Sequence, residues 1–236
     1  MLFISPPFGN YIELKNCISI KGSFTLYERS GLVTQIIKTL RYSFEHQGWV
    51  NKIGLRNKGL DYAIKKYKNT NHIVSIAILN KEEIPHIIKK LPNNMNIELN
   101  ISCPNINKSL VNSGLKEFIN KERDWCIVKL SPVSDFSLVD ILYSEGFRQF
   151  HCSNTIPIKE GGLSGYKIQE YNKKLIGYIK NNYNDCIVIG GGGIRTRSDL
   201  IFYKNLGCDY FSISTLFFNP IEFSIFYYNF ISNNKV

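Results

Sequence analysis

Eight short runs rich in β-branched residues recur along the chain, and segments with helical spacing separate them. The runs are Leu2–Ser5, Cys17–Lys21, His72–Ala77, Asn96–Ser102, Cys126–Leu130, Gln149–Ser153, Cys186–Gly190 and Tyr210–Ser214. The segment Ile-Val-Ser-Ile-Ala-Ile at residues 73–78 is apolar on both faces, which is typical of a parallel strand covered on both sides. Eight strands alternating with helices predict an α/β fold, a closed (β/α)8 TIM barrel.

Helical spacing fills most of the intervening segments. It occurs near Lys81–Leu91, Ser109–Asn120, Phe136–Glu145, Ile168–Asn181, Ser198–Asn205 and Ile221–Ser232. Between residues 22 and 71 the alternation breaks, and we expect two helical pieces flanking a loop at Gly48–Asn57. Only 11 residues join the first strand to the second, so the first βα unit should be shortened. We expect one compact domain over residues 1–236, a length typical of this barrel.

Composition limits the class of protein. No run of about eighteen apolar residues occurs, and the N-terminus lacks a basic leader with an apolar core, so we expect neither a membrane span nor a signal peptide. The six cysteines are scattered singly, which argues against disulfides, a zinc site or a cluster and favours the cytoplasm. The net charge of +10 fits a solvated lysine-rich surface, attraction of an anionic ligand, or nucleic acid.

Polar residues stand where several of the predicted strands end. Lys21, Asn100, Cys103, Lys129 and Asn154 all lie at or just after a strand. Active sites of this barrel form at the carboxyl ends of its strands. Lys129 lies within an apolar run and needs a partner, because an unpaired buried charge is costly. That partner is either an acidic residue of the barrel or an anionic ligand.

Four glycines, Gly190–Gly193, follow the seventh predicted strand. Glycine lets backbone amides approach a phosphate closely, and the loops after strands seven and eight are the usual phosphate site of such barrels. A tight turn is the alternative reading. No Gly-Lys-Ser/Thr follows, so this is not a nucleotide P-loop.

The segment Asn100-Ile-Ser-Cys-Pro-Asn105 places a cysteine in a proline-containing loop beside two side-chain amides. Such a cysteine is a candidate base or nucleophile, although a single cysteine can also be an inert buried thiol.

These blocks, taken in order, resemble the dihydroorotate dehydrogenases. Glu98–Asn105 resembles the active-loop motif of that family. The other matching blocks are Phe8–Asn10, Ile20–Ser23, Asn51–Leu55 with Gly59–Asp61, Val128–Pro132, Ser153–Thr155, Gly161–Gly165, Ile189–Ile194 and Ser214–Thr215. The resemblance therefore covers nearly the whole chain.

The resemblance implies FMN-dependent oxidation of (S)-dihydroorotate to orotate, a step of pyrimidine biosynthesis. Cys103 would be the general base that removes the C5 proton, while hydride passes from C6 to N5 of FMN, and Lys129 would face the N1/C2 edge of the flavin. The substrate-binding residues would be Asn51, Asn100, Asn105, Asn154 and Thr155. The cofactor-binding residues would be Ser5, Lys21, Gly22, Asn100, Lys129, Gly165, Gly191, Gly192, Gly193, Ser214 and Thr215. No metal is implied.

Two positions depart from the family pattern. The turn after the first strand is Ile4-Ser5-Pro6 where the family often has Ala-Ser-Gly, and proline lacks an amide donor. Ser214 stands where glycine is common. These changes are compatible with a streamlined enzyme, an altered substrate or an inactive flavin-binding paralogue.

A cysteine rather than a serine at position 103 resembles the soluble class of the family. The electron acceptor would then be fumarate, or NAD reached through an iron–sulfur partner subunit, and we favour a homodimer. The main rival is a tRNA dihydrouridine synthase, another FMN barrel with an Asn-x-x-Cys-Pro loop. The Ser153–Thr155 and Gly161–Gly165 blocks argue against it, so we expect no nucleic-acid partner.

Overall fold

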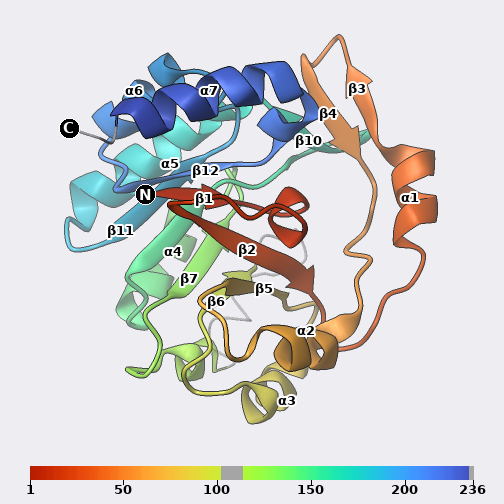
Figure 1. The fold of residues 1–236 in the computed structure, drawn as a ribbon. Helices are drawn as coiled ribbons and strands as arrows, with labels where there is room; N and C mark the ends of the chain where they lie inside the picture. Colours follow the sequence, from red (N-terminus) through yellow and green to blue (C-terminus); the bar gives the residue numbers. More distant parts are fainter. Residues whose placement is uncertain (102–113, 234–236) are drawn as a thin grey trace.

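The computed structural model describes residues 1–101 and 114–233, and Figure 1 shows a barrel of strands surrounded by helices. Eight strands close the barrel in the order β1-β12-β11-β8-β7-β6-β5-β2, and every neighbouring pair is parallel. They are β1 (Leu2–Ile4), β2 (Cys17–Phe24), β5 (Ile73–Ala77), β6 (Ile97–Asn100), β7 (Cys126–Leu130), β8 (Gln149–Cys152), β11 (Ile187–Gly191) and β12 (Tyr210–Ile213). The predicted TIM barrel is confirmed.

Seven helices accompany the strands in residues 1–101 and 114–233. They are α1 (Leu32–Thr39), α2 (Gly59–Tyr67), α3 (Glu83–Lys90), α4 (Phe136–Ser144), α5 (Ile168–Asn182), α6 (Arg197–Asn205) and α7 (Pro220–Asn233). The connections described also include the 3-10 turns η1 (Phe8–Asn10), η3 (Leu115–Phe118) and η4 (Thr215–Phe218). The first βα unit is shortened as predicted, because η1 is all that stands in place of a helix. None of the described helices is long and apolar enough to cross a membrane.

The structure departs from the sequence prediction in two segments. Of the helix expected at Ser109–Asn120, the described part holds only η3, and residues 109–113 lie outside the described residues. The loop expected at Gly48–Asn57 was wrong for its first four residues, which form a strand, β4 (Gly48–Asn51).

That strand belongs to a second sheet, built from β3 (Arg41–Ser43), β4, β10 (Gly161–Gly165) and β9 (Ile156–Ile158) in this order. All three pairings are antiparallel, and in Figure 1 β3 and β4 project beside the barrel. β10, with three glycines in five residues, has weak intrinsic β-propensity. β4 and β10 stabilise each other although more than a hundred residues separate them, so no local pattern announces either.

The interior of the barrel changes from apolar to polar along its strands. Phe3, Ile20, Ile73, Ile127 and Ile189 form an apolar layer inside. Side chains two residues apart in a strand share a face, so the next inward layer toward the carboxyl ends consists of Ser5, Ser75, Lys129, Gly191 and their neighbours Glu98, His151 and Ser212. The polar residues therefore gather at the end of the barrel where sites form in this fold.

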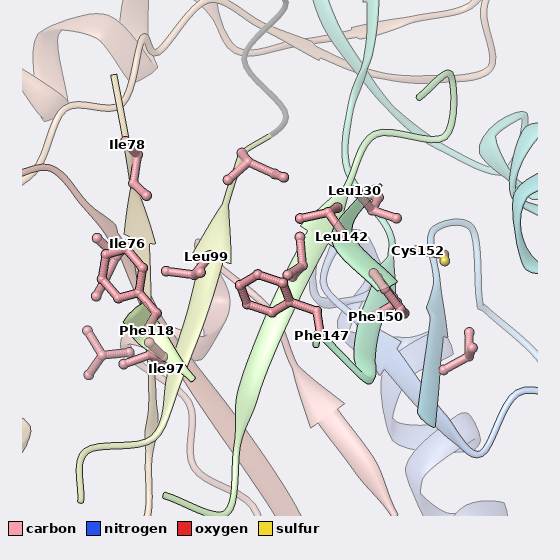
Figure 2. Close-up of a cluster of buried hydrophobic side chains, with 14 of the residues drawn as sticks. Ile76, Ile78, Ile97, Leu99, Phe118, Leu130, Leu142, Phe147, Phe150 and Cys152 are labelled. Atoms are coloured by element: carbon pink, nitrogen blue, oxygen red, sulfur yellow. The ribbon is translucent and has the colours of Figure 1, made fainter. Parts of the chain in front are cut away.

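The opposite faces of the strands pack against the helices. Figure 2 shows part of this outer core, where Ile76 lies beside Phe118 and Leu130 beside Leu142, all members of one buried cluster with Leu99 and Phe147. All six are almost completely buried. This apolar layer holds the wall of the barrel rigid, and the polar interior layer is positioned by it.

Candidate active site

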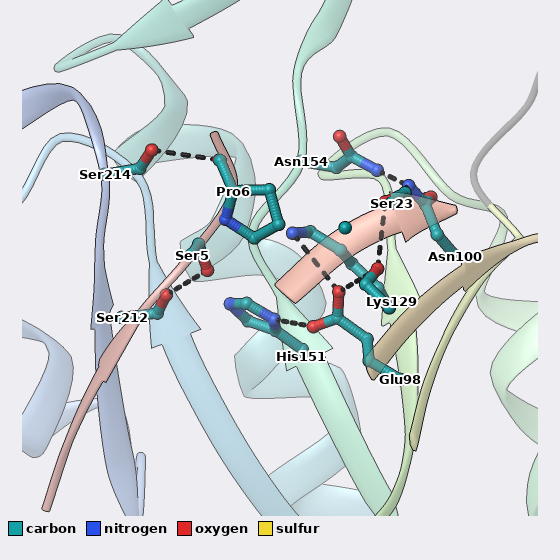
Figure 3. A network of polar contacts seen from close by, with 12 residues as sticks. Ser5, Pro6, Ser23, Glu98, Asn100, Lys129, His151, Asn154, Ser212 and Ser214 are labelled. Atoms are coloured by element: carbon teal, nitrogen blue, oxygen red, sulfur yellow. Dashed lines mark hydrogen bonds and ion pairs between the residues drawn. The ribbon is translucent and has the colours of Figure 1, made fainter. Parts of the chain in front are cut away.

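A fully buried carboxylate, Glu98 of β6, lies at the centre of the polar layer. Its Oε2 is 2.6 Å from Nδ1 of His151 in β8, and its Oε1 accepts a hydrogen bond of 2.8 Å from the hydroxyl of Ser75 in β5. Nζ of Lys129 in β7 is 3.5 Å from the same Oε1. Figure 3 shows the side chains of Glu98, His151 and Lys129 pointing toward one another inside the barrel.

The charges of this cluster are compensated among its members. Burial opposes ionisation of Glu98, but Lys129, His151 and the two hydrogen bonds outweigh it and lower the pKa of Glu98 to about 2. Burial, and then the nearby Lys129, lower the pKa of His151 below its usual 6.5, against the opposing effect of Glu98. At neutral pH the cluster is therefore an ionised Glu98, a cationic Lys129 and a neutral His151. His151 donates from Nδ1, and its buried Nε2 has no partner within the described chain.

A chain of hydrogen bonds runs from Glu98 to the rim of the barrel. Ser75 uses its single proton on Glu98, so Ser23 donates to Ser75 across 2.9 Å. Asn100 donates in turn to Ser23 at 3.0 Å, and Asn154 donates to Oδ1 of Asn100 at 3.1 Å. All donors point toward the carboxylate, so the bonds polarise one another.

Three of the predicted site residues are thus brought together. Asn100 and Lys129 are partners in the register of β6 and β7, and Asn154 follows β8. The strand ends of a parallel barrel meet at one rim, and this places two amides above a buried cation.

Lys21 is not brought to this cluster. Ile20 belongs to the interior layer, so Lys21, the next residue of β2, has its side chain on the outer face. Its ammonium lies 2.9 Å from Glu13 and 5.9 Å from the centroid of the Tyr67 ring in α2.

The reason lies in the irregular end of β2. Lys21 pairs with Val74 and Phe24 with Ile76, so two residues, Gly22 and Ser23, stand opposite one. β2 also runs three residues beyond its predicted end at Lys21. Such a bulge re-aims side chains, and here it directs the hydroxyl of Ser23 into the barrel. The amide and carbonyl of Gly22 are both bonded to the side chain of Asn10.

Asn51 and Thr155 lie on either side of Gly162. Asn51 ends β4 and pairs with Gly162 of β10. A Cβ on Gly162 would be 2.8 Å from Oγ1 of Thr155, so the hydroxyl lies against this glycine. The structure brings these two predicted residues near each other, where the central strand β4 of the second sheet ends.

The predicted phosphate residues lie on two adjacent loops. Gly191 of β11 and Ser212 of β12 are register partners, so the segments that follow them leave the barrel side by side. Gly193 lies against Gly165, because a Cβ on Gly193 would be 3.0 Å from the Gly165 carbonyl oxygen. In the second loop, Ser214 caps η4, which begins at Thr215.

The turn after β1 is tied to this second loop. The Ser5 and Ser212 hydroxyls are 2.6 Å apart, and Ser214 donates to the Pro6 carbonyl at 3.0 Å. The Ser5 amide donates to Ile213. The Ile4-Ser5-Pro6 turn therefore forms part of the wall beside the predicted phosphate loop.

Cys103 and Asn105 lie outside the described residues. The five described cysteines, Cys17, Cys126, Cys152, Cys186 and Cys208, are free, and burial raises the pKa of every one of them. They are structural thiols, because a reactive cysteine needs a lowered pKa and exposure.

Comparison with known proteins agrees with this arrangement. The family model described as dihydroorotate dehydrogenase matches residues 10–222. The chain belongs to the dihydroorotate dehydrogenase family. The resemblance in the sequence motifs is therefore confirmed, and the chain is an oxidoreductase of that family.

Curated relatives include proteins of Alkaliphilus metalliredigens (27% identical, covering 90% of this chain and 80% of the relative) and Malacoplasma penetrans (28% identical, covering 88% and 85%). Both are named dihydroorotate dehydrogenase B (NAD(+)), catalytic subunit. A crystal structure of ligand-free DHODH from Eimeria tenella shares the fold, with a TM-score of 0.68, 17% identity and coverage of 94% of this chain and 80% of that chain.

Four polar residues of this dihydroorotate dehydrogenase fold escaped the sequence analysis. They are Ser23, Ser75, Glu98 and His151. A usable signal existed for two of them. Ser75 lies two positions after the interior residue Ile73, and Glu98 lies two positions before the predicted site residue Asn100, so each shares a strand face with it. His151 has Gln149 and Ser153 at these spacings, and neither was a predicted site residue. Ser23 had no such signal, since only the bulge in β2 turns it inward.

Proposed function

We propose that the chain oxidises (S)-dihydroorotate to orotate with FMN as its cofactor, using one domain formed by residues 1–236. The observation that carries the proposal is the placement at one end of the barrel of a charge-compensated lysine, Lys129, beneath the amides of Asn100 and Asn154. A cation and two amides facing one space suit a flat, polar ring system and a carboxylate-bearing substrate.

The glycine-rich turn fits the phosphate end of FMN. A Cβ on Gly191 would be 2.8 Å from Oγ of Ser153, and one on Gly193 would be 2.7 Å from the Cα of Tyr166. Only glycine leaves room for the backbone to run there. In the described part of the chain, the amides of Gly192, Gly193 and Ile194 have no hydrogen-bond acceptor. Unpaired amides at a glycine turn are suited to an anion.

At the ring end, the residues of this chain hold charge in place. Lys129 keeps a positive charge at the floor of the site, and Glu98 neutralises it before any ligand arrives. FMN, when bound, supplies the acceptor for the hydrogen and the electron pair removed from the substrate. A fixed cation beside such an acceptor stabilises the negative charge that it gains.

At the substrate, we propose that Asn51, Asn100, Asn105, Asn154 and Thr155 bind and orient the ring and its carboxylate. Orientation of this kind lowers the entropy cost of reaching the reactive geometry. Cys103, three residues after the end of β6, is proposed as the base that takes the C5 proton. A thiol is a few per cent ionised near neutral pH, so turnover should rise as the pH approaches the pKa of this cysteine.

We further propose NAD as the final electron acceptor, reached through a partner subunit in the cytoplasm. Support comes from the names of the relatives, which describe a catalytic subunit and NAD(+). Fumarate with a homodimer is the alternative, and a mass measurement of the purified protein with and without a co-expressed partner separates the two.

The test is an anaerobic absorbance titration of the purified protein with dihydroorotate. The proposal expects a yellow protein whose flavin absorbance bleaches at stoichiometric substrate. Bound flavin that stays oxidised would contradict the proposed substrate and favour the inactive paralogue, or the tRNA reductase if NADPH then bleaches it. A protein that refuses added FMN would contradict the cofactor.

A further inference from the structure

The carbonyl groups of the glycine turn are held from the side of the helices. The hydroxyl of Tyr203 in α6 lies 2.6 Å from the Gly191 carbonyl oxygen and 2.7 Å from that of Gly192. Nδ2 of Asn172 in α5 donates to the Gly191 oxygen at 2.5 Å. Tyr203 and Asn172 are completely buried.

The third carbonyl is held in the same way. Nε2 of Gln169 in α5 donates to the Gly193 oxygen at 3.0 Å and to Asp199 at 2.9 Å. The other carboxylate oxygen of Asp199 accepts from the backbone amides of Arg195 and Thr196. Asp199, at the start of α6, therefore binds the backbone amides that follow the glycine turn and does not bind the amides of the turn itself.

Pinning these carbonyls decides where the amides point. A peptide unit is planar and trans, so its C=O and N–H groups point in opposite directions. The oxygens of residues 191, 192 and 193 face α5 and α6, so the N–H groups of Gly192, Gly193 and Ile194 face away from the helices. Gly192 and Gly193 have φ of 87° and 73°, values that glycine adopts without strain.

Gly190 leaves the space that the ring of Tyr203 occupies. A Cβ at this position would lie 2.6 Å from Cδ1 of Tyr203 and 2.5 Å from Sγ of Cys208. Glycine there lets the tyrosine ring pass beneath the turn and reach its carbonyls. Burial raises the pKa of Tyr203, so its hydroxyl keeps its proton throughout the working range.

We propose that Tyr203, Asn172 and Gln169 are positioning residues that hold three backbone amides ready for a phosphate monoester, and that Tyr203 thereby sets the preference for FMN over riboflavin. This inference rests on the proposed function only in its choice of FMN as the ligand. None of the three side chains has to touch the phosphate. They act by preventing the turn from relaxing in the absence of ligand, and such preorganisation adds affinity by removing an ordering cost.

The experiment compares Tyr203→Phe with the wild type in binding of FMN and riboflavin to flavin-depleted protein, followed by flavin fluorescence. The variant keeps the ring and removes only the hydroxyl. We expect FMN affinity to fall about tenfold, the scale of one lost hydrogen bond in a site that must stay ordered. Riboflavin affinity should stay unchanged, because riboflavin has no phosphate.

Tyr183→Phe is the matched control. Its hydroxyl donates to Asp140 at 2.6 Å in a cluster between α4 and α5, away from the turn. It loses the same atom, and both affinities should match the wild type. If Tyr203→Phe lowers FMN and riboflavin affinities equally, or neither, the positioning role is overturned.

A second variant covers the case in which Tyr203→Phe does not fold. Asn172→Leu removes one donor to Gly191 together with a buried Oδ1 that has no partner in the described chain. It should lower FMN affinity severalfold and leave riboflavin binding unchanged. Unchanged FMN affinity would contradict the inference.

Inorganic phosphate is the probe that distinguishes failure of the proposed cofactor from failure of the positioning role. If the wild type binds no flavin, the proposed function fails, but phosphate should still raise its melting temperature, and less so for Tyr203→Phe. Equal shifts for both proteins would overturn the inference on its own.

Discussion

The two ends of the candidate cofactor site handle charge in opposite ways. At the floor of the barrel, ionised side chains compensate one another, with Glu98 opposite Lys129. At the glycine turn, neutral side chains, Tyr203 and Asn172 among them, orient backbone dipoles. A ring that gains negative charge during the reaction is stabilised by a nearby cation, whereas a phosphate that takes no part in the reaction needs only oriented donors. The floor should therefore respond to pH and to charge-changing substitutions, and the turn should not.

The largest effect is expected on turnover, for a variant that leaves both flavin-binding regions unchanged. Cys103→Ala should lower turnover by about a hundred- to ten-thousandfold, the contribution of a general base. Flavin affinity should stay near the wild-type value, because neither the floor nor the turn is altered. Stopped-flow bleaching of the flavin by dihydroorotate measures the first quantity and equilibrium fluorescence the second. Loss of flavin from this variant would give Cys103 a structural role instead.

A smaller but still substantial effect is expected for the stability of the floor. Glu98→Gln leaves Lys129 buried without its counter-charge, and breaking one side of a buried ion pair costs about 3–5 kcal/mol. Urea unfolding measures the loss. The matched control is Asp185→Asn, which breaks the half-exposed pair with Arg148 at 2.8 Å. That change should cost less than about 1 kcal/mol. Equal losses of unfolding free energy would show that the Glu98–Lys129 pair contributes no more than an ordinary surface ion pair.

The pH dependence of stability should also belong to the floor. Folding lowers the pKa of His151 from 6.5 and that of Glu98 from 4.5 to about 2. Both groups bind fewer protons in the folded chain, so their contribution is present at high pH and lost as the pH falls. The histidine part is lost below pH 6.5, and the carboxylate part between pH 4.5 and about 2.

His151→Phe should therefore flatten the fall in the urea midpoint just below pH 6.5. His86→Gln, a change at an exposed histidine, should follow the wild-type curve. Parallel curves for the wild type and His151→Phe would mean that His151 does not titrate with folding.

The smallest effect is expected at the turn. Arg195 follows the glycines, but its guanidinium pairs with Glu222 and its amide with Asp199. If neutral backbone donors bind the phosphate, Arg195→Gln should change FMN affinity by less than about fivefold, the range of an exposed ion pair. A salt titration of FMN binding gives a second reading. A hundredfold loss would place a cationic side chain at the phosphate and erase the contrast with the floor.

Much of the site could be predicted from the sequence because strand position encodes it. Lys129, Asn100 and Asn154 were identified at strand ends, and the barrel brings them together. The glycine run was recognised for its lack of side chains. The sequence did not predict which side chains contact each other across neighbouring strands. Glu98 and His151 are 53 residues apart and meet only because β6, β7 and β8 are neighbours in a closed barrel.

The second sheet and the direction of the Lys21 side chain also could not be predicted from the sequence. β4 and β10 are short, β10 has three glycines in five residues, and their pairing joins segments far apart in the sequence. Lys21 stands in the block that resembles a flavin-contacting motif, yet the strand face it occupies turns it toward Glu13 and α2.

The sequence by itself determined the barrel and the end of the barrel where polar residues gather, because hydrophobic periodicity and strand length are local properties. It also determined the family, because short motifs in a fixed order are read directly from the chain. Only the tertiary structure decided that Glu98 neutralises Lys129 and that the ring of Tyr203 passes beneath Gly190. It also decided that Ser23 of β2 points into the barrel while Lys21 points outward. Each of these depends on which side chains face each other across separate elements, and that is settled only when the sheet closes and the helices pack against it.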